Sequence, residues 1–295
     1  MQYLILGANG YIGSFLYKNM KEDGLKVIGT GHNREGEKDL IYFDALRDSI
    51  INIINRTDEK EKTAIICIAQ ANIDQCKYEY ELSRQINVTF VKKAVERLLQ
   101  NRFHVIFFST DNVFDGKKGN YTENDMPNAI NQYGLMKWEM EDYLLENFPE
   151  VCIFRIPKVL GVEREKQNLL TDFEGKLNGE AIRCIKNSCI SIITKEDLYH
   201  ACLISSEQKM RGLYNLSCGE QYSRRQLAEK FFAAFGVYDK EIVELELDKF
   251  CFKDLRPLKI GLDNSKFRNE TGYDFITYDT LINQYRVMNQ KDSIG

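Results

Sequence analysis

Three polar side chains in the middle of the sequence have the right chemical types to protonate a carbonyl group. Tyr133 and Lys137 are four residues apart in a segment of helical character, so they would share one face of a helix. Thr110 ends an apolar stretch that is typical of a buried strand. A tyrosine phenol, with a reference pKa of about 10, is a weak acid–base group unless a cation stabilises the phenolate. Lys137 would supply that cation, and Thr110 a hydrogen bond to the carbonyl oxygen.

The spacing alone is weak evidence, because Tyr17 and Lys21 are also four residues apart and fit an ordinary helix surface. The pair that begins at Tyr133 differs because it follows a strand that ends in Ser109 and Thr110. In a doubly wound sheet, the carboxyl ends of the strands line the ligand crevice. We therefore expect the hydroxyl, the phenol and the ammonium group to meet at that edge.

The first thirteen residues, MQYLILGANGYIG, predict a strand, a glycine turn and the start of a helix. Gly7 permits a sharp turn, Gly10 lets the backbone approach a pyrophosphate, and Gly13 allows the helix to pack closely on the strand. The free N–H groups of the helix N-terminus favour phosphates. The turn therefore predicts a dinucleotide cofactor. The predicted contacts in the turn are Gly7, Asn9, Gly10, Tyr11, Ile12 and Gly13.

The end of the second predicted strand indicates which dinucleotide is bound. An NAD enzyme usually places Asp or Glu there to hold the ribose 2′-hydroxyl. This chain has Thr30 or Gly31 at that point, followed by His32 and Arg34. The missing carboxylate removes repulsion of a 2′-phosphate, and an arginine can pair with it. The sequence favours NADP(H) and leaves NAD(H) open, with Asp44 expected near the adenine.

Short apolar runs alternate with longer amphipathic segments in the first half of the chain. The predicted strands lie at 3–6, 26–30, 40–43, 64–69, 103–109 and 151–156. The predicted helices lie at 11–22, 88–99 and 133–148. Strand–helix alternation of this kind requires parallel strands with crossover helices. We expect an α/β fold with a doubly wound parallel sheet of the Rossmann type.

The second half, after about residue 161, has a looser pattern and predicts a smaller C-terminal α/β lobe that binds substrate. Its expected elements are a helix at 163–178, a strand at 212–217, a helix at 223–235, an irregular segment at 243–272 and a final helix at 278–288. The expected Rossmann domain comprises 1–160 plus about 190–218, and the substrate lobe comprises about 161–189 and 219–295.

Composition excludes several other classes of function. Forty basic and forty-four acidic residues give a net charge of −4 without a basic block, so no nucleic-acid partner is expected. No apolar run approaches the roughly 20 residues of a membrane span, and no signal peptide is predicted. Eight cysteines without a CxxC pair, beside three histidines, predict no metal site and a reduced, cytoplasmic protein.

Longer motifs carry a resemblance to a known family. The stretch from Ser109 to Gly116 is STDNVFDG, and the stretch from Tyr121 to Glu141 is YTENDMPNAINQYGLMKWEME. Further on, GLYNLSCGEQYSRRQLAEKF and RPLKIGLDNSKF continue the pattern. Over nearly its whole length the sequence resembles the dTDP-4-dehydrorhamnose reductase family of extended short-chain dehydrogenases. These long motifs are much more specific than the glycine turn.

The resemblance implies an NAD(P)H-dependent reductase of the 4-keto group of a nucleotide-linked deoxysugar, in polysaccharide biosynthesis. Thr110, Tyr133 and Lys137 would be its catalytic residues, and its partners a nucleotide-linked keto sugar and, as an open option, a second copy in a homodimer. Further implied cofactor contacts are Ala69, Gln70, Asn87, Ser109, Lys137 and Ile156. Implied substrate contacts are Val113, Phe114, Asn187 and Arg256.

Three departures from the family pattern lie on the substrate side and leave alternatives open. Met136 replaces a small hydroxyl residue before the lysine, RIPKVLG occupies 155–161, and IKNSCISIITKEDL occupies 185–198. One alternative is a sugar-nucleotide epimerase, or another keto-sugar reductase, on the same scaffold. The other is a non-catalytic NADP-binding regulatory subunit like the methionine adenosyltransferase β subunit.

Overall fold

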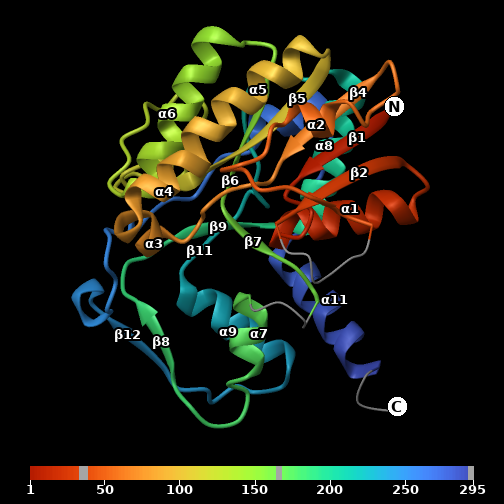
Figure 1. The fold of residues 1–295 in the computed structure, drawn as a ribbon. Helices are drawn as coiled ribbons and strands as arrows, with labels where there is room; N and C mark the ends of the chain where they lie inside the picture. Colours follow the sequence, from red (N-terminus) through yellow and green to blue (C-terminus); the bar gives the residue numbers. More distant parts are fainter. Residues whose placement is uncertain (33–38, 164–167, 292–295) are drawn as a thin grey trace.

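A parallel sheet of seven strands organises the computed structural model (Figure 1), which describes residues 1–32, 39–163 and 168–291. The strand order is β10-β6-β5-β4-β1-β2-β3, and all pairs are parallel. The strands are β1 Gln2–Leu6, β2 Lys26–Gly31, β3 Ile41–Tyr42, β4 Lys62–Ile66, β5 Phe103–Thr110, β6 Cys152–Ile156 and β10 Gly212–Asn215. The chain proceeds outward in both directions from β1 and β4, so the strand order reverses between these two strands. A reversal of this kind opens a crevice at the carboxyl edge of the sheet.

Helices cover both faces of the sheet because successive side chains of its strands point to opposite sides. On β1, Leu4 and Leu6 pack in one apolar cluster, and Tyr3 and Ile5 in another. The first cluster includes α5 Val91–Gln100 and α6 Gln132–Asn147, and the second includes α1 Tyr11–Glu22 and α8 Lys195–Gln208. The predicted doubly wound Rossmann sheet is confirmed.

Four short helical segments precede α5, and a fifth directly follows β5. They are α2 Ile51–Ile54, α3 Ile73–Tyr78, α4 Tyr80–Arg84, the π-helix η1 Gln85–Phe90 and the 3₁₀-helix η2 Asp111–Val113. The π-helix leads directly into α5, so the helical path begins earlier than the predicted 88–99. Short π segments within helices often occur at functional sites.

The second half forms two small sheets and a helical layer below the main sheet in Figure 1. One sheet joins β7 Lys158–Leu160, β9 Ile190–Thr194 and β11 Gln221–Tyr222, and the other joins β8 Ile182–Ile185 and β12 Ile242–Leu245. The helices are α7 Leu169–Glu174, α9 Arg224–Ala234, the 3₁₀-helix η3 Leu247–Lys249, α10 Ser265–Thr271 and α11 Tyr278–Lys291. Phe173, Phe231 and Tyr285 bring α7, α9 and α11 into a third apolar cluster.

The sequence analysis did not predict β7, β8, β9 or β11, and its prediction for this half differs from the structure at three further points. The helix expected at 163–178 is formed only at 169–174 within its described part. The segment 243–272, expected to be irregular, contains most of β12 and all of α10. Helix α8 was missed, although its start carries a capping box in which Thr194 accepts from Asp197 N (2.9 Å) and Asp197 accepts from Thr194 N (3.1 Å).

The division of the chain into two lobes stays a prediction. Two late residues, Phe267 and Phe275, pack in the cluster formed with α1 and α8 on the main sheet. The chain therefore crosses back to the sheet after the helical layer. Among the described residues, none of the helices combines the length and the apolar character that crossing a membrane requires.

A buried ion pair ties three elements of the main sheet together behind its carboxyl edge. Arg155 of β6 and Glu141 of α6 have side chains only 2% exposed, with 2.6 Å between Nη2 and Oε2. Arg155 Nε also donates to both oxygens of Glu141, at 3.0 and 3.1 Å. Ser109 of β5 donates its hydroxyl proton to the same carboxylate. The network fixes α6 against β5 and β6.

Removing one partner of this pair should destabilise the fold, because the remaining charge would stay buried without compensation. We expect Glu141→Gln to lower the free energy of unfolding by about 3 kcal/mol or more. Urea unfolding measures this change. The control is Glu139→Gln. Glu139 pairs with Arg84 and Lys92 at the surface, so this substitution should lower the free energy of unfolding by less than about 1 kcal/mol. Equal losses for the two variants would contradict the role of the buried network.

Candidate active site

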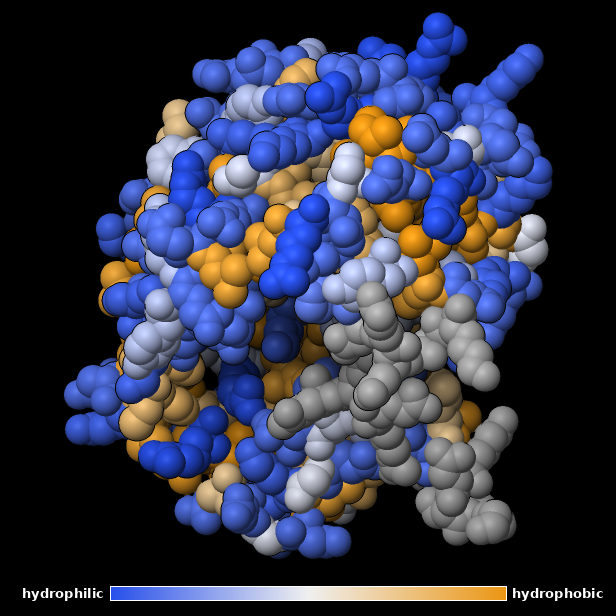
Figure 2. Space-filling view, viewed as in Figure 1, coloured by the Kyte–Doolittle hydropathy of each residue, from blue (hydrophilic) through white to orange (hydrophobic). Residues whose placement is uncertain are grey.

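A cavity of about 550 Å³ lies at the carboxyl ends of the central strands. Figure 2 shows a hollow on this face, between the sheet above and the helical layer below. A second cavity adjoins it, and the two share Gly10, Cys67 and Ala69 in their walls. Together they form one long groove over the point where the strand order reverses. A groove of this shape suits an extended ligand with two ends.

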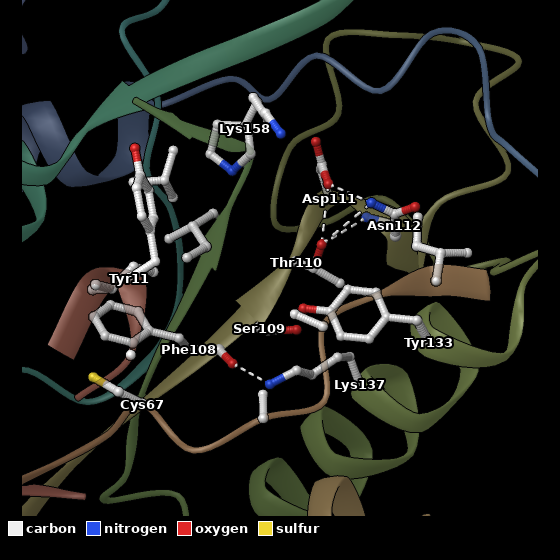
Figure 3. A pocket seen from close by; sticks show the side chains of 18 of the residues that line it. Tyr11, Cys67, Phe108, Ser109, Thr110, Asp111, Asn112, Tyr133, Lys137 and Lys158 are labelled. Atoms are coloured by element: carbon white, nitrogen blue, oxygen red, sulfur yellow. Dashed lines mark hydrogen bonds between the residues drawn. The ribbon is translucent and has the colours of Figure 1, made fainter. Parts of the chain in front are cut away.

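The three residues that the sequence singles out for proton chemistry all line the first cavity (Figure 3). Lys137 is 4% exposed, and its Nζ donates to the carbonyl oxygen of Phe108 at 2.8 Å. The same Nζ lies 6.0 Å from the centre of the Tyr133 ring. The Thr110 hydroxyl donates to Asp111 Oδ1 at 3.1 Å. The structure thus brings together the groups whose convergence the spacing predicts, and their roles stay predictions.

The first turn of α6 explains how Tyr133 comes to lie beside Thr110. Asn131 caps the helix by accepting from Gly134 N at 2.8 Å, and its amide donates to Asn112 Oδ1 at 3.2 Å. A Cβ on Gly134 would lie only 2.0 Å from the carbonyl oxygen of Asn112. Only glycine allows α6 to pack this closely on η2. Gly134 therefore helps to position the phenol of Tyr133.

Burial sets the protonation states of the central pair. Burial raises the pKa of Tyr133 above its ordinary value, the charge of Asp111 adds to the rise, and Thr110 opposes it. Burial lowers the pKa of Lys137 to about 8, against the charge of Glu141. At neutral pH the phenol keeps its proton, and most of Lys137 is still charged. A protonated phenol beside an ammonium group can act as a proton donor.

The glycine turn forms the floor of the groove at the start of α1. Gly7 has a φ of 90°, which favours glycine, and a Cβ on Gly13 would lie 2.2 Å from the carbonyl oxygen of Gly7. The N-cap residue of α1 is Gly10, and Tyr11, Ile12 and Gly13 of its first turn line the groove. This arrangement fits the pyrophosphate of a dinucleotide.

The second cavity is lined by two residues predicted for the adenosine end, His32 and Asp44, together with other predicted cofactor contacts. Gly7, Asn9, His32, Asp44 and Gln70 all line it. His32 Nε2 lies 3.8 Å from Asp44 Oδ2, and Oδ1 of the same carboxylate accepts a hydrogen bond from a backbone N–H two residues later, at 2.9 Å. These positions suit the adenosine half of a dinucleotide. The predicted contact Arg34 lies outside the described residues.

Other predicted cofactor residues line the groove or support it. Ala69 lies where the two cavities meet, and Ser109 and Ile156 line the first cavity. Asn87 is 1% exposed and clamps the loop after β4, since its side chain accepts from Gln70 N (2.8 Å) and donates to Gln70 O (2.9 Å). Asn87 therefore supports the wall from behind, from the π-helix.

Two of the residues that the family resemblance implies for substrate binding are core residues. Val113 and Phe114 are fully buried and are absent from the cavity wall. The Phe114 ring stacks on Tyr121 with 4.0 Å between ring centres, in a small apolar cluster. The two residues support the loop that follows β5, and their implied role in substrate binding stays a prediction.

The other two implied substrate residues also lie away from the described wall of the first cavity. Arg256 Nη2 pairs with Asp74 Oδ1 at 2.9 Å and donates from Nη1 to the carbonyl oxygen of Asp254 at 3.1 Å. Asn187 occupies an exposed turn between β8 and β9 with a φ of 60°. Neither lines the cavity, and their substrate role stays a prediction.

Two charged residues of the cavity were not predicted. Asp111 is 4% exposed, and burial raises the pKa of its carboxyl group to about 7 despite hydrogen bonds from Thr110 and Asn112. Lys158, at the start of β7, faces it from another wall (Figure 3). Asp111 directly follows the strand-end hydroxyls, and Lys158 lies in one of the stretches that depart from the family pattern. These two sequence positions could have identified both residues as candidates.

The family comparison covers almost the whole chain. Residues 1–288 match the family model described as RmlD substrate binding domain. Methionine adenosyltransferase 2 subunit beta of Danio rerio is 27% identical over 258 residues, which is 82% of this chain and 76% of that protein. The probable low-salt glycan biosynthesis reductase Agl14 of Haloferax volcanii is 28% identical over 172 residues, 58% of this chain and 57% of that protein.

Solved structures with the same fold include several dTDP-4-dehydrorhamnose reductases. A hypothetical one from Sulfolobus tokodaii has a TM-score of 0.82 and 27% identity, covering 95% of this chain and 99% of its own. The enzyme from Bacillus anthracis in complex with NADP has a TM-score of 0.84 and 19% identity, covering 98% of this chain and 100% of its own. The similarity to the Sulfolobus tokodaii protein extends to the sequence, and the similarity to the Bacillus anthracis enzyme shows the fold alone.

Proposed function

The chain belongs to the RmlD substrate binding domain family, and we propose that it is an NAD(P)H-dependent reductase of the 4-keto group of a nucleotide-linked deoxysugar. The observation that carries the proposal is the meeting of Thr110, Tyr133 and Lys137 in a cavity that continues into the glycine turn. The resemblance to dTDP-4-dehydrorhamnose reductases, first visible in the motifs, is confirmed at the level of the family.

The residues of the groove fit a nicotinamide dinucleotide. The N-terminus of α1 would hold the pyrophosphate, and the cavity that contains His32 and Asp44 would hold the adenosine half. Lys137 and Ile156 would border the nicotinamide half in the first cavity. When bound in its reduced form, such a cofactor supplies a hydride for a carbonyl carbon.

Three residues of the chain then stabilise and neutralise the negative charge that develops on the carbonyl oxygen. Tyr133, which burial keeps protonated, donates its proton to that oxygen as negative charge develops there. Lys137 lies behind the phenol and stabilises the phenolate that remains. Thr110 donates a second hydrogen bond to the oxygen and orients it.

We propose NADP(H) as the preferred cofactor and keep NAD(H) as the alternative. Strand β2 ends in Thr30 and Gly31, so the described residues at its end carry no carboxylate that would repel a 2′-phosphate. His32 follows and lines the adenosine cavity. Asp44 lies in the same cavity, but its carboxylate is close to His32 and to the backbone of the next turn.

Cofactor preference can be tested by titration of NADPH and NADH. We expect His32→Ala and Arg34→Ala each to weaken NADPH binding several-fold while NADH binding changes little, because a cation near the 2′-phosphate acts on NADPH alone. Fluorescence of the bound reduced nicotinamide gives both dissociation constants. An equal effect on the two cofactors would defeat the 2′-phosphate assignment and favour NAD(H).

The proton donor can be tested by removing one oxygen atom. We expect Tyr133→Phe to reduce kcat by about 10²–10⁴-fold, the usual contribution of a positioned acid, and to leave NADPH binding nearly intact. Screening nucleotide-linked 4-keto sugars while following NADPH oxidation gives the turnover. Tyr17→Phe is the control, since this tyrosine has the same spacing to a lysine but lies on α1 and packs in the apolar cluster beneath the sheet. Wild-type turnover in the Tyr133 variant would rule out its role.

The pH dependence should follow Lys137. Its pKa of about 8 means that the ammonium group is present below that pH and is lost above it. We expect kcat/KM, which reports the free enzyme, to fall as pH rises through about 8. Lys137→Met should lower kcat/KM throughout and abolish this fall. Asp111→Asn is the control, because it removes the other group that titrates near neutrality and should leave the fall near pH 8 in place.

A non-catalytic regulatory subunit is the second candidate, favoured by the 27% identity to the Danio rerio methionine adenosyltransferase subunit. The two candidates differ in what the chain does alone. A regulatory subunit would bind NADP and a partner enzyme stably and would not turn over any keto sugar. The epimerase alternative would instead copurify with tightly held NAD⁺. The presence of Thr110, Tyr133 and Lys137 together in this chain supports the proposal of a reductase.

A further inference from the structure

Lys158 is a cation on the wall of the catalytic cavity that the mechanism does not use. It begins β7, which lies outside the seven-stranded sheet and pairs with β9. The side chain is exposed to the cavity, and Figure 3 shows it pointing across toward Asp111. Within the described part of the chain, Lys158 forms no ion pair and no side-chain hydrogen bond. Its ammonium group therefore faces open space inside the cavity.

The charged groups around this space leave a positive surplus. Among the described residues of the wall, the ordinarily charged side chains are Asp111, Lys137 and Lys158. Burial brings the pKa of Asp111 to about 7, so this carboxyl group is only partly ionised at neutral pH. Burial and the nearby Arg224 lower the pKa of Lys158, and Asp111 opposes them. Among the described residues of the wall, negative charge therefore compensates the positive charge of Lys158 only weakly.

The position of Lys158 assigns it to the substrate side of the cavity. The cofactor side is formed by the start of α1 and the loop after β4. Lys158 shares its side with Ile190 and Ile260, which come from segments far along the chain. Between the two sides lie the hydroxyl groups of Thr110 and Tyr133. A substrate whose carbonyl oxygen meets these hydroxyls must extend toward β7.

We infer that Lys158 is a substrate-specificity residue that binds an anionic oxygen of the substrate, either a carboxylate on the sugar or a phosphate of the attached nucleotide. The inference rests on the proposed function and adds the chemistry of one substrate group to it. A cation in a partly dry cavity contributes most when a full negative charge pairs with it. The stretch RIPKVLG, which departs from the family pattern, places this cation there.

Binding of defined probes tests the inference without turnover. Calorimetry with NADP⁺ present would titrate UDP, UDP-glucose and UDP-glucuronate, with the matching dTDP compounds, into wild type and Lys158→Met. We expect the variant to bind at least one class of probe about tenfold more weakly, and Lys158→Arg to restore most of that binding. Lys60→Met is the matched control, since this exposed lysine lines a different cavity, near the amino ends of β4 and β5.

The pattern of losses identifies the source of the charge. Equal weakening of all probes, the bare nucleoside diphosphates included, assigns Lys158 to the diphosphate. Weakening confined to the glucuronate assigns it to a sugar carboxylate. Unchanged binding of every probe by Lys158→Met overturns the inference and leaves the proposed function standing. If wild type binds no probe at all, the proposed function fails and the inference fails with it.

Discussion

The contact on which the site depends is the one between the first turn of α6 and the end of β5. Gly134 approaches the carbonyl oxygen of Asn112 so closely that a single methyl group would prevent it. This approach sets the phenol of Tyr133 beside Thr110 and, one turn later, brings Lys137 to the Phe108 carbonyl. The buried network of Glu141 holds the same helix two turns further on. A shift of α6 would carry Tyr133 and Lys137 together away from Thr110 at the end of β5.

The same burial that positions these groups sets their chemistry. Burial in a low-dielectric cavity lowers the pKa of Lys137 to about 8 and keeps the phenol of Tyr133 protonated. The carbonyl of Phe108 partly replaces the water that Lys137 lost, so the ammonium group survives at neutral pH. The electrostatics of the site therefore follow from packing.

The sequence predicts the local parts of the structure well. The glycine turn, α1 and the strands β1, β2 and β5 follow from periodicity and from residues such as Gly7 that tolerate few conformations. The meeting of Thr110 with Tyr133 and Lys137 also follows, because parallel strands place their carboxyl ends at one edge. Helix α8 was missed because its apolar residues are spread around the helix, although the capping signal at Thr194 was visible.

The substrate side could not be predicted in the same way, because it is assembled from distant segments. Val113 and Phe114 follow β5 and Thr110 closely, yet the turn of η2 directs them into the core. Lys158, Ile190 and Ile260 share a wall although about a hundred residues separate the first from the last. No local pattern encodes such a meeting, which depends on how β7 and β9 pair and on where the later chain crosses. The cofactor half of the groove is therefore fixed by short-range sequence, and the half that selects the substrate is free to vary with long-range packing.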